Sequence, residues 1–458
     1  WFGTSEMPSQ PCVCASAPGK VILFGEHAVV YGKQAIAASL SDLRIWVKVT
    51  PNDTRHLRVQ MPDLPSPMDV MFDSSELQLS STLHEPPTKG DADLLQEILR
   101  SAVPYCPKSA RPVGAMLDLH VTAMVPLLYL ILRLASDTLK NGLDIEVRSQ
   151  DLPVGAGLGS SAAFGVACAA ALLPFARSSS SSIKLPPIGR PNSDQLEIIR
   201  TYSFYSEILL HGTPSGIDNA VSTFGGAIDY TKNKDGTTTM EQFCTSFKLE
   251  MILANTHVPR STKAMVAKVR ESFEKYPAII EAILTCIGNI AYQFRQISFK
   301  EQDQQYTCGA EIEQVLTLIR LNQQMLQALG VSHGSLNRIS EIVADVAGFD
   351  DAAVKLTGAG GGGCAMILLK PDDKCKALAK MIQNKLESRS YTKPWKFSCL
   401  RSSVGQEGVL WMKPDVFPSV SDDNRRRSLD TKKMQTLTTI IAIVGIVVIS
   451  YSNIVRKK

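Results

Sequence analysis

The residues with the clearest chemical meaning form a glycine-rich loop at 155–163, which reads Gly-Ala-Gly-Leu-Gly-Ser-Ser-Ala-Ala. Residues 143–147 alternate apolar and charged side chains ahead of it, as a half-buried strand does, and a small apolar run behind it predicts a helix. Glycines let the backbone approach a ligand, and a helix N-terminus directs unpaired N–H groups at an anion. The segment therefore predicts a phosphate site. Its expected binding residues are Gly155, Ala156, Gly157, Leu158, Gly159, Ser160 and Ser161.

The glycines could also belong to other kinds of loop. No Gly-Lys-Ser/Thr closes the loop, so it is not a Walker P-loop, while a tight turn in a core of small residues stays open for this segment alone. A later run, 358–363, fits Gly-x-Gly-x-x-Gly. A dinucleotide fingerprint needs a helix after the glycines, and here the apolar, strand-like residues 365–369 follow, which favours a loop that supports a neighbouring phosphate site.

Four charged positions stand where a ligand could reach them. Lys20 lies between Pro-Gly and an apolar run, Asp218 lies in a loop rich in Gly, Ser and Pro, and Glu26 and His27 follow a glycine. Each also has a structural interpretation: a surface lysine for Lys20, a helix N-cap for Asp218 and a structural pair for Glu-His.

Taken together, these segments resemble the GHMP kinases, and within them the mevalonate kinase family. The resemblance lies in residues 17–32, 155–163, 211–223, 258–262 and 355–369 and covers roughly 12–405. Residues 25–30 read Gly-Glu-His-Ala-Val-Val, whereas galactokinases usually follow Glu-His with Thr-Asp or Asn-Asp. The resemblance implies an α+β, two-domain GHMP kinase fold. Its N-terminal domain, 12–234, would be ribosomal protein S5 domain 2-like and bind ATP, and its C-terminal domain, 235–405, would be ferredoxin-like.

The same resemblance implies the chemistry. The enzyme would use ATP and Mg²⁺ to phosphorylate the primary hydroxyl of mevalonate, in isoprenoid and sterol synthesis. Asp218 would take the hydroxyl proton, and Lys20 would stabilise the developing negative charge and contact the nucleotide. Phosphoryl transfer requires such positioning and neutralisation of charge rather than covalent catalysis.

Metal and substrate residues are also implied by the resemblance. Ser161 and Glu207 would hold Mg²⁺, although a solvated helix glutamate is the alternative for Glu207. Glu26 and His27 would lie beside the acceptor, binding it or holding Lys20 and Asp218 in place, and Arg260 and Thr262 would support substrate or phosphate.

Two departures from the family pattern concern the nucleotide. The family often has a serine three residues before the Leu-Pro of its second motif, and here Ser149 is displaced by one place. The asparagine that often follows an early Leu-Pro corresponds to Asp63 in Met-Pro-Asp. Nucleotide preference is therefore less well specified than phosphoryl transfer.

Other functions remain as alternatives. One is a different GHMP kinase, such as a galactokinase or phosphomevalonate kinase; another is an inactive, membrane-tethered nucleotide-binding protein. Net charge is +4 without a basic stripe bearing aromatics, which argues against nucleic acid as a partner, and the ten scattered cysteines suggest free thiols. A homodimer is the expected assembly.

Hydrophobic patterns predict the elements that must position these residues. Residues 119–135 are apolar but contain Pro126 and are too short to span a bilayer, so a buried helix is favoured. Strands are expected at 36–40, 43–49, 249–254, 365–369 and 395–401. Helices are expected at 193–211, capped by Ser193, and over 260–300, 309–347 and 373–387.

The C-terminal tail has a different composition. Residues 413–433 are polar and basic and read as a linker, whereas 434–455 carry no charge. A stretch of that length is close to one membrane span, so it predicts an anchor that leaves the catalytic part in the cytoplasm. A gene-model or fusion artefact, or a segment packed on the enzyme, are the alternatives.

Overall fold

A computed structural model describes residues 11–74, 119–153, 157–176, 184–211, 214–233, 237–243, 249–298, 309–348 and 350–419. Its strands are β1 (Val13–Phe24), β2 (Ala35–Pro51), β3 (His56–Met61), β4 (Met68–Asp73), β5 (Leu143–Gln150), β6 (Ala227–Lys232), β7 (Thr238–Phe243), β8 (Leu249–Asn255), β9 (Ala352–Leu356), β10 (Cys364–Leu369), β11 (Ser398–Val404) and β12 (Leu410–Met412). They form one mixed sheet, ordered β4-β3-β5-β2-β11-β8-β10-β9, to which β1, β12, β6 and β7 are joined.

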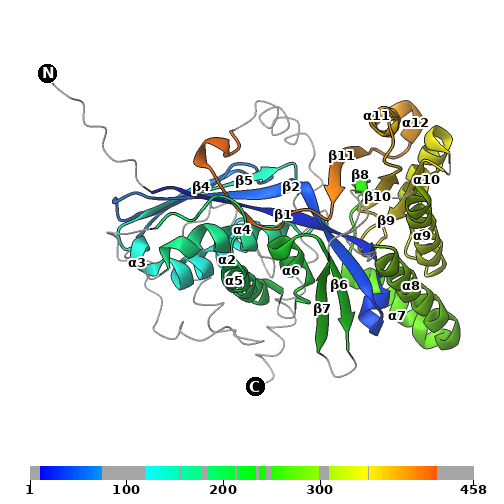
Figure 1. The fold of residues 1–458 in the computed structure, drawn as a ribbon, viewed down its shortest axis with the longest axis horizontal. Coiled ribbons are helices and arrows are strands. Elements are labelled where there is room, and N and C mark those ends of the chain that lie inside the picture. Colours follow the sequence, from blue (N-terminus) through cyan, green and yellow to red (C-terminus); the bar gives the residue numbers. More distant parts are fainter. Residues whose placement is uncertain are drawn as a thin grey trace.

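Helices cover this sheet in two groups (Figure 1). The first contains α2 (Leu119–Leu134), α3 (Ser136–Leu139), α4 (Ser160–Leu172), α5 (Ser193–His211) and α6 (Ile217–Phe224). The second contains α7 (Thr262–Lys275), α8 (Pro277–Ser298), α9 (Gly309–Ala328), α10 (Gly334–Ala347), α11 (Cys375–Glu387) and α12 (Arg389–Thr392). Short 3₁₀ turns are η1 (Ala28–Tyr31), η6 (Leu173–Phe175) and η7 (Pro414–Val416). This arrangement confirms the α+β fold class.

The two halves of the sheet meet at one point. All of β11 runs antiparallel to β8, and its last residue, Val404, also pairs with Leu40 of β2. After β11 the chain returns, and β12 pairs with β1. The domain boundary expected at 234/235 falls between β6 and β7, two strands that pair with each other. The division of the chain into two domains stays a prediction.

Helix α4 explains how the N-terminal half is packed. Nearly all its side chains are small and apolar, and from Ala162 to Leu172 only Phe164 is not fully buried. A helix that is apolar on every side must be enclosed, here between the sheet and α5. At Gly165 an added Cβ would lie 3.1 Å from Ser206 Oγ of α5, so the two helices approach each other closely there.

The prediction for residues 119–135 is confirmed, since α2 is a helix whose inward residues, such as Leu127 and Leu128, are buried. Helix α8 is long and apolar enough to span a membrane, judged by length and composition alone. Its inner face, including Ile287 and Phe294, is buried, as in a core helix of a globular fold. The predicted anchor at 434–455 lies outside the described residues, as does the linker beyond residue 419.

Some expected boundaries were wrong. The strands expected at 36–40 and 43–49 are one strand, β2, because β1 pairs along both parts and a register shift at Pro18/Gly19 absorbs the intervening residues. The long helical patterns each divide in two, at Tyr276 and at Gly330, whose φ is +71°. Helix α5 is capped by Asn192 rather than Ser193, since the Asn192 side chain accepts a hydrogen bond from the Gln195 N–H at 2.9 Å.

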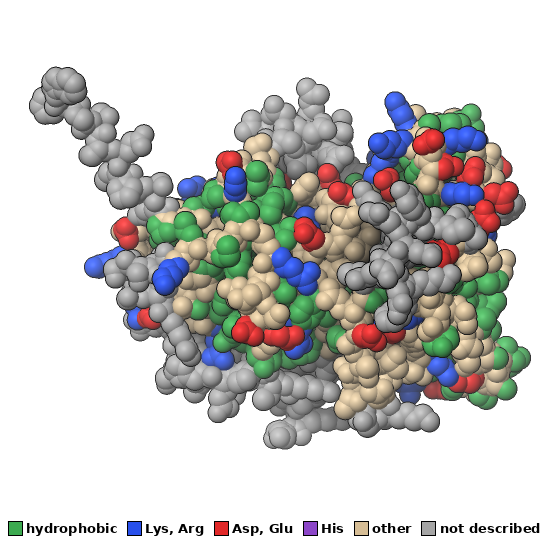
Figure 2. Space-filling view, viewed as in Figure 1, with side chains coloured by type: hydrophobic (Ala, Val, Ile, Leu, Met, Phe, Trp, Pro, Cys, Tyr) green, Lys and Arg blue, Asp and Glu red, His purple; other side chains and the backbone are tan. Residues whose placement is uncertain are grey.

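Charged side chains of both signs are interspersed over the face of the molecule seen in Figure 2. This distribution agrees with the small net charge of +4. The described cysteines are free thiols, and most of them, including Cys364, are buried.

Candidate active site

The centre of the site is an ion pair between two distant parts of the chain. Lys20, on β1, places its Nζ 3.1 Å from Oδ1 of Asp218, in the first turn of α6. The Lys20 side chain is only 9% exposed, whereas that of Asp218 is 34% exposed, so the carboxylate remains open to a ligand. Gly216 is the N-cap of α6, and the N-cap interpretation of Asp218 is therefore wrong.

The glycine loop lies directly on this pair. The Lys20 N–H donates to the Leu158 carbonyl at 2.8 Å. Gly159 has φ +73°, and a Cβ there would lie 2.7 Å from Cγ of Lys20. Ser160 then begins α4, as the strand–loop–helix pattern predicted. Gly155 and Ala156 lie outside the described residues.

Helix α5 brings a carboxylate to the same place. Glu207 is buried, and its carboxylate lies close enough to the Ser161 hydroxyl for that group to favour the ionised form. Burial, with help from the Asp218 charge, raises the pKa of Glu207 to about 7, while the Ser161 hydroxyl and Lys20 oppose the rise. The solvated-helix interpretation of Glu207 is therefore wrong.

Residues 17–32 and 155–163 are the first and second glycine segments, and a third glycine loop, residues 357–363, approaches from the C-terminal half. Gly358, Gly360, Gly361, Gly362 and Gly363 all have positive φ values. Arg260 lies between this loop and the second one, because a Cβ at Gly157 would be 1.4 Å from its Nη2 and one at Gly363 would be 2.8 Å from its Cδ. Its Nη1 donates to the Thr357 carbonyl at 3.1 Å.

The guanidinium therefore connects two of the three glycine segments. Burial lowers the pKa of Arg260. Thr262 is exposed at the start of α7, whose N-cap is Ser261. Cys364, just beyond the loop, is buried, and burial raises the pKa of its thiol to about 11, so it is a packed residue.

Gly157→Ala is expected to disturb the site, because the new Cβ would overlap Arg260 and φ is +80° at this position. Backbone strain of this kind costs roughly 1–3 kcal/mol. We expect a lower thermal midpoint and a higher KM for the substrate. Gly189→Ala is the control, since a Cβ there meets nothing within 4 Å although φ is also positive. Equal effects of the two variants on KM would contradict the prediction.

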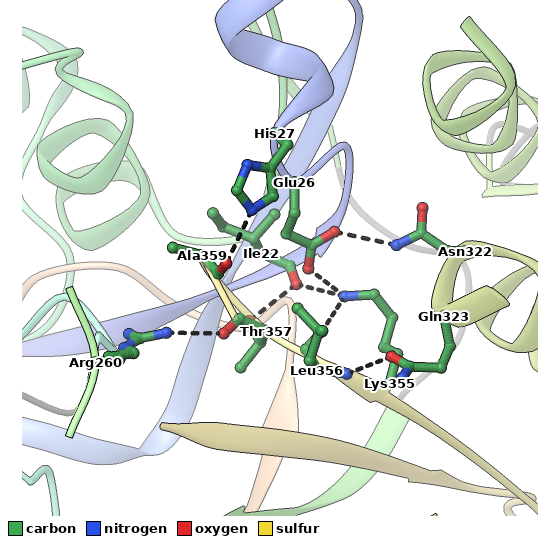
Figure 3. Close-up of polar contacts among 10 residues, drawn as sticks. All are labelled: Ile22, Glu26, His27, Arg260, Asn322, Gln323, Lys355, Leu356, Thr357 and Ala359. Atoms are coloured by element: carbon green, nitrogen blue, oxygen red, sulfur yellow. Dashed lines mark hydrogen bonds and ion pairs between the residues drawn. The ribbon is translucent and has the colours of Figure 1, made fainter. Parts of the chain in front are cut away.

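Glu26 and His27 lie in the turn between β1 and η1, and the side chains of both contact residues of the C-terminal half (Figure 3). The buried Glu26 carboxylate forms an ion pair with Lys355 of β9. His27 Nε2 lies 2.9 Å from the Ala359 carbonyl, to which an N–H at this nitrogen donates. Burial lowers the pKa of His27, so its ring is neutral near pH 7.

Lys355 was missed in the sequence, together with Asn322 and Gln323, which contact Glu26 and Leu356. The available signal was a lone charge in the apolar strand β9, directly before the glycines. The two positions that depart from the family pattern do meet, because the Ser149 N–H donates to Oδ2 of Asp63 at 2.9 Å.

Comparisons with known proteins identify relatives of the chain. The family described as "GHMP kinases N terminal domain" matches residues 126–226. Mevalonate kinases from Bos taurus and Homo sapiens are each 36% identical to the chain, and both matches cover 86% of this chain and 93% of the relative. A crystal structure of L. major mevalonate kinase in complex with R-mevalonate has a TM-score of 0.58 at 20% identity, covering 86% of this chain and 96% of that one. A Methanococcus jannaschii mevalonate kinase has a TM-score of 0.57 at 19% identity, covering 89% and 99%.

Proposed function

Because the chain belongs to the mevalonate kinase family of GHMP kinases, as its 36%-identical relatives show, we propose that it transfers the terminal phosphoryl group of ATP to the primary hydroxyl of mevalonate. The products are 5-phosphomevalonate and ADP, and the reaction serves isoprenoid and sterol synthesis. The observation that carries the proposal is the Lys20–Asp218 pair beside the second glycine loop.

In this mechanism the Asp218 carboxylate accepts the proton of the mevalonate hydroxyl. The hydroxyl oxygen forms its bond to the γ-phosphorus, and the bond from that phosphorus to the bridging oxygen breaks, leaving ADP. The partial exposure of Asp218 allows the substrate to reach it, and the Lys20 ammonium at 3.1 Å stabilises the charge that develops on the oxygen. The unpaired N–H groups at the start of α4 would bind the phosphates of ATP.

Lys20→Met is expected to lower kcat by about a hundred-fold or more, since it removes a preorganised positive charge from the transition state. The methionine keeps the apolar stem that packs against Gly159. Steady-state assays with saturating mevalonate and ATP measure the effect. Lys140→Met, which alters an exposed pair with Asp137, is the control. A kcat for Lys20→Met equal to that of the control would rule out this role.

Ser161 at the start of α4 and Glu207 of α5 fit a magnesium ion. Mg²⁺ prefers oxygen ligands and takes only a few from the protein, and Glu207 offers a buried carboxylate close to the Ser161 hydroxyl. Burial, more than the neighbouring Asp218 charge, raises the pKa of Glu207 to about 7, and a bound cation would favour the ionised form. When bound, Mg²⁺ would neutralise phosphate charge. Glu207 and Ser161 would hold it.

For the acceptor, we propose Arg260 and Thr262 as binding residues. Arg260 lies between the second and third glycine loops, and Thr262 is exposed beside it at the start of α7. The contacts of Glu26 and His27 with Lys355 and Ala359 favour the positioning role among the roles expected for this pair.

A coupled assay of the full chain with ATP and R-mevalonate tests the function, and galactose and phosphomevalonate are the comparison acceptors. We expect mevalonate to be turned over at a kcat/KM at least about a thousand-fold above the others, because the site would leave polar groups unpaired with a wrong acceptor. Turnover of galactose alone would overturn the proposal.

Two further predictions concern membrane anchoring and the oligomeric state. The uncharged residues 434–455 are proposed to anchor the enzyme to a membrane, with the catalytic part in the cytoplasm, and the enzyme is proposed to be a homodimer. Membrane fractionation with and without residues 434–458 tests the first, and light scattering of the chain ending at 419 tests the second.

A further inference from the structure

A buried polar cluster joins the turn after β1 to the C-terminal half of the molecule (Figure 3). The side chains of Lys355 and Glu26 are 0% and 1% exposed. The Lys355 ammonium pairs with the Glu26 carboxylate and also donates to the carbonyls of Leu356, at 2.9 Å, and Ile22, at 3.3 Å. All three of its N–H groups therefore have acceptors.

Helix α9 completes the cluster from the other side. Asn322 Nδ2 donates to Oε2 of Glu26 at 3.1 Å, so both oxygens of this carboxylate are bonded. Gln323 Oε1 accepts from the Leu356 N–H at 2.8 Å, on the side of β9 that does not pair with β10. A buried charged pair is costly unless its members are satisfied in this way.

The cluster is attached to two parts of the active site. Ile22, whose carbonyl accepts from Lys355, lies two residues after Lys20 on β1. Its carbonyl also accepts from the Thr357 hydroxyl at 3.2 Å, and Thr357 directly precedes Gly358. Lys355 and Thr357, at the start of the third glycine loop, thus both donate to one main-chain carbonyl of the strand that carries Lys20.

We propose that Lys355 is a positioning residue of this kinase, which through Glu26 and Ile22 fixes the third glycine loop in register with the strand that carries Lys20. The inference rests on the proposed phosphoryl transfer. It assigns the ion pair a role in the transfer step, because displacement of reacting groups by about 1 Å can cost a hundred-fold in rate. A pair that served only stability would affect unfolding and leave kcat unchanged in the folded enzyme.

Neutralising both partners separates these roles. Glu26→Gln/Lys355→Met leaves no unpaired buried charge, and such replacements are often tolerated. In the full chain, checked for folding by circular dichroism and thermal unfolding, we expect kcat to fall about ten- to a hundred-fold with KM for ATP and mevalonate changed less than about three-fold. Each single variant should fall at least as far, since the two residues act as a unit.

Lys33→Met/Glu281→Gln is the matched control. It neutralises another ion pair between the two halves, from Lys33, shortly after η1, to Glu281 of α8. The distance between the paired atoms is 2.6 Å, and the two side chains are 26% and 46% exposed. We expect the kcat of the Lys33→Met/Glu281→Gln variant to equal that of the unaltered enzyme. A folded Glu26→Gln/Lys355→Met variant with unaltered kcat would overturn the proposal, as would a rise in mevalonate KM in Glu26→Gln alone with normal kcat in Lys355→Met, which would indicate that Glu26 binds substrate directly.

If the double variant fails to fold, Asn322→Ala decides the question, because it leaves both charges in place and removes one hydrogen bond to Glu26. A smaller fall in kcat at unchanged KM supports the proposal, and an unaltered kcat overturns it. Failure of the proposed function itself would show differently, as absence of mevalonate turnover in the unaltered chain.

Discussion

Asp218→Asn is expected to lower kcat about a thousand-fold or more, because an amide cannot accept the proton of the attacking hydroxyl. Asparagine has nearly the shape of aspartate, so the first turn of α6 and the neighbouring glycine loop keep their geometry. The loss of the 3.1 Å pair also leaves the Lys20 ammonium without its carboxylate, in a side chain only 9% exposed. Both effects act on the transfer step, and the KM for ATP should change only a few-fold.

Rapid quench of a single turnover, together with binding of a fluorescent ATP analogue, measures the two quantities separately. Asp137→Asn is the matched control, since that carboxylate is exposed on α3 and pairs only with Lys140 among the described contacts. A single-turnover rate for Asp218→Asn within ten-fold of the control would show that another group takes the proton.

Much of the fold could be predicted because its signals are local. The alternation before the second glycine loop and the small apolar residues after it predicted β5 and α4, and the apolar residues after the third loop predicted β10. Where two patterns merged, local signals failed. The continuous strand β2 depends on pairing with β1 across a register shift, and no periodicity within 35–51 reveals that partner.

The residues of the site likewise include some that local sequence predicts and others that depend on distant contacts. Glycine spacing and the neighbouring Ser, Lys and Asp residues are visible in short segments, and the structure brings Lys20, Asp218, Ser161 and Glu207 together. The role of Lys355 could not be predicted beyond that of a lone charge in an apolar strand, because it depends on contacts with Glu26 and Ile22, more than 300 residues earlier in the chain. Its type alone suggests a surface residue, and only the fold shows that its ammonium is buried.

Glu207 illustrates a conflict between stability and function. Its pKa in the folded chain is about 7 against an ordinary value of 4.5, mainly because burial disfavours its charge. A raised folded-state pKa contributes stability that is fully present below the unfolded pKa and is lost as pH rises through the folded one. In the absence of a cation, the ionised Glu207 side chain therefore opposes folding above pH 7, by up to about 3 kcal/mol for a shift of this size.

Glu207→Gln should consequently make the metal-free protein more stable and the enzyme much less active. Glutamine can still accept a hydrogen bond from Ser161 but carries no charge, so we expect a thermal midpoint in EDTA that is several degrees higher at pH 8 and nearly unchanged at pH 5. Turnover with Mg²⁺ and ATP should fall about a hundred-fold or more, because the anionic oxygen ligand is lost.

Glu197→Gln, on the same helix but with a side chain 57% exposed, is the control and should alter neither quantity. Calorimetry at the two pH values measures the stability change independently of catalysis. A midpoint for Glu207→Gln that is lower than that of the unaltered protein at pH 8 would mean that the buried carboxylate is compensated by the chain itself. The case for a cation at Ser161 and Glu207 would then rest on their oxygen donors alone, since a compensated carboxylate needs no further positive charge.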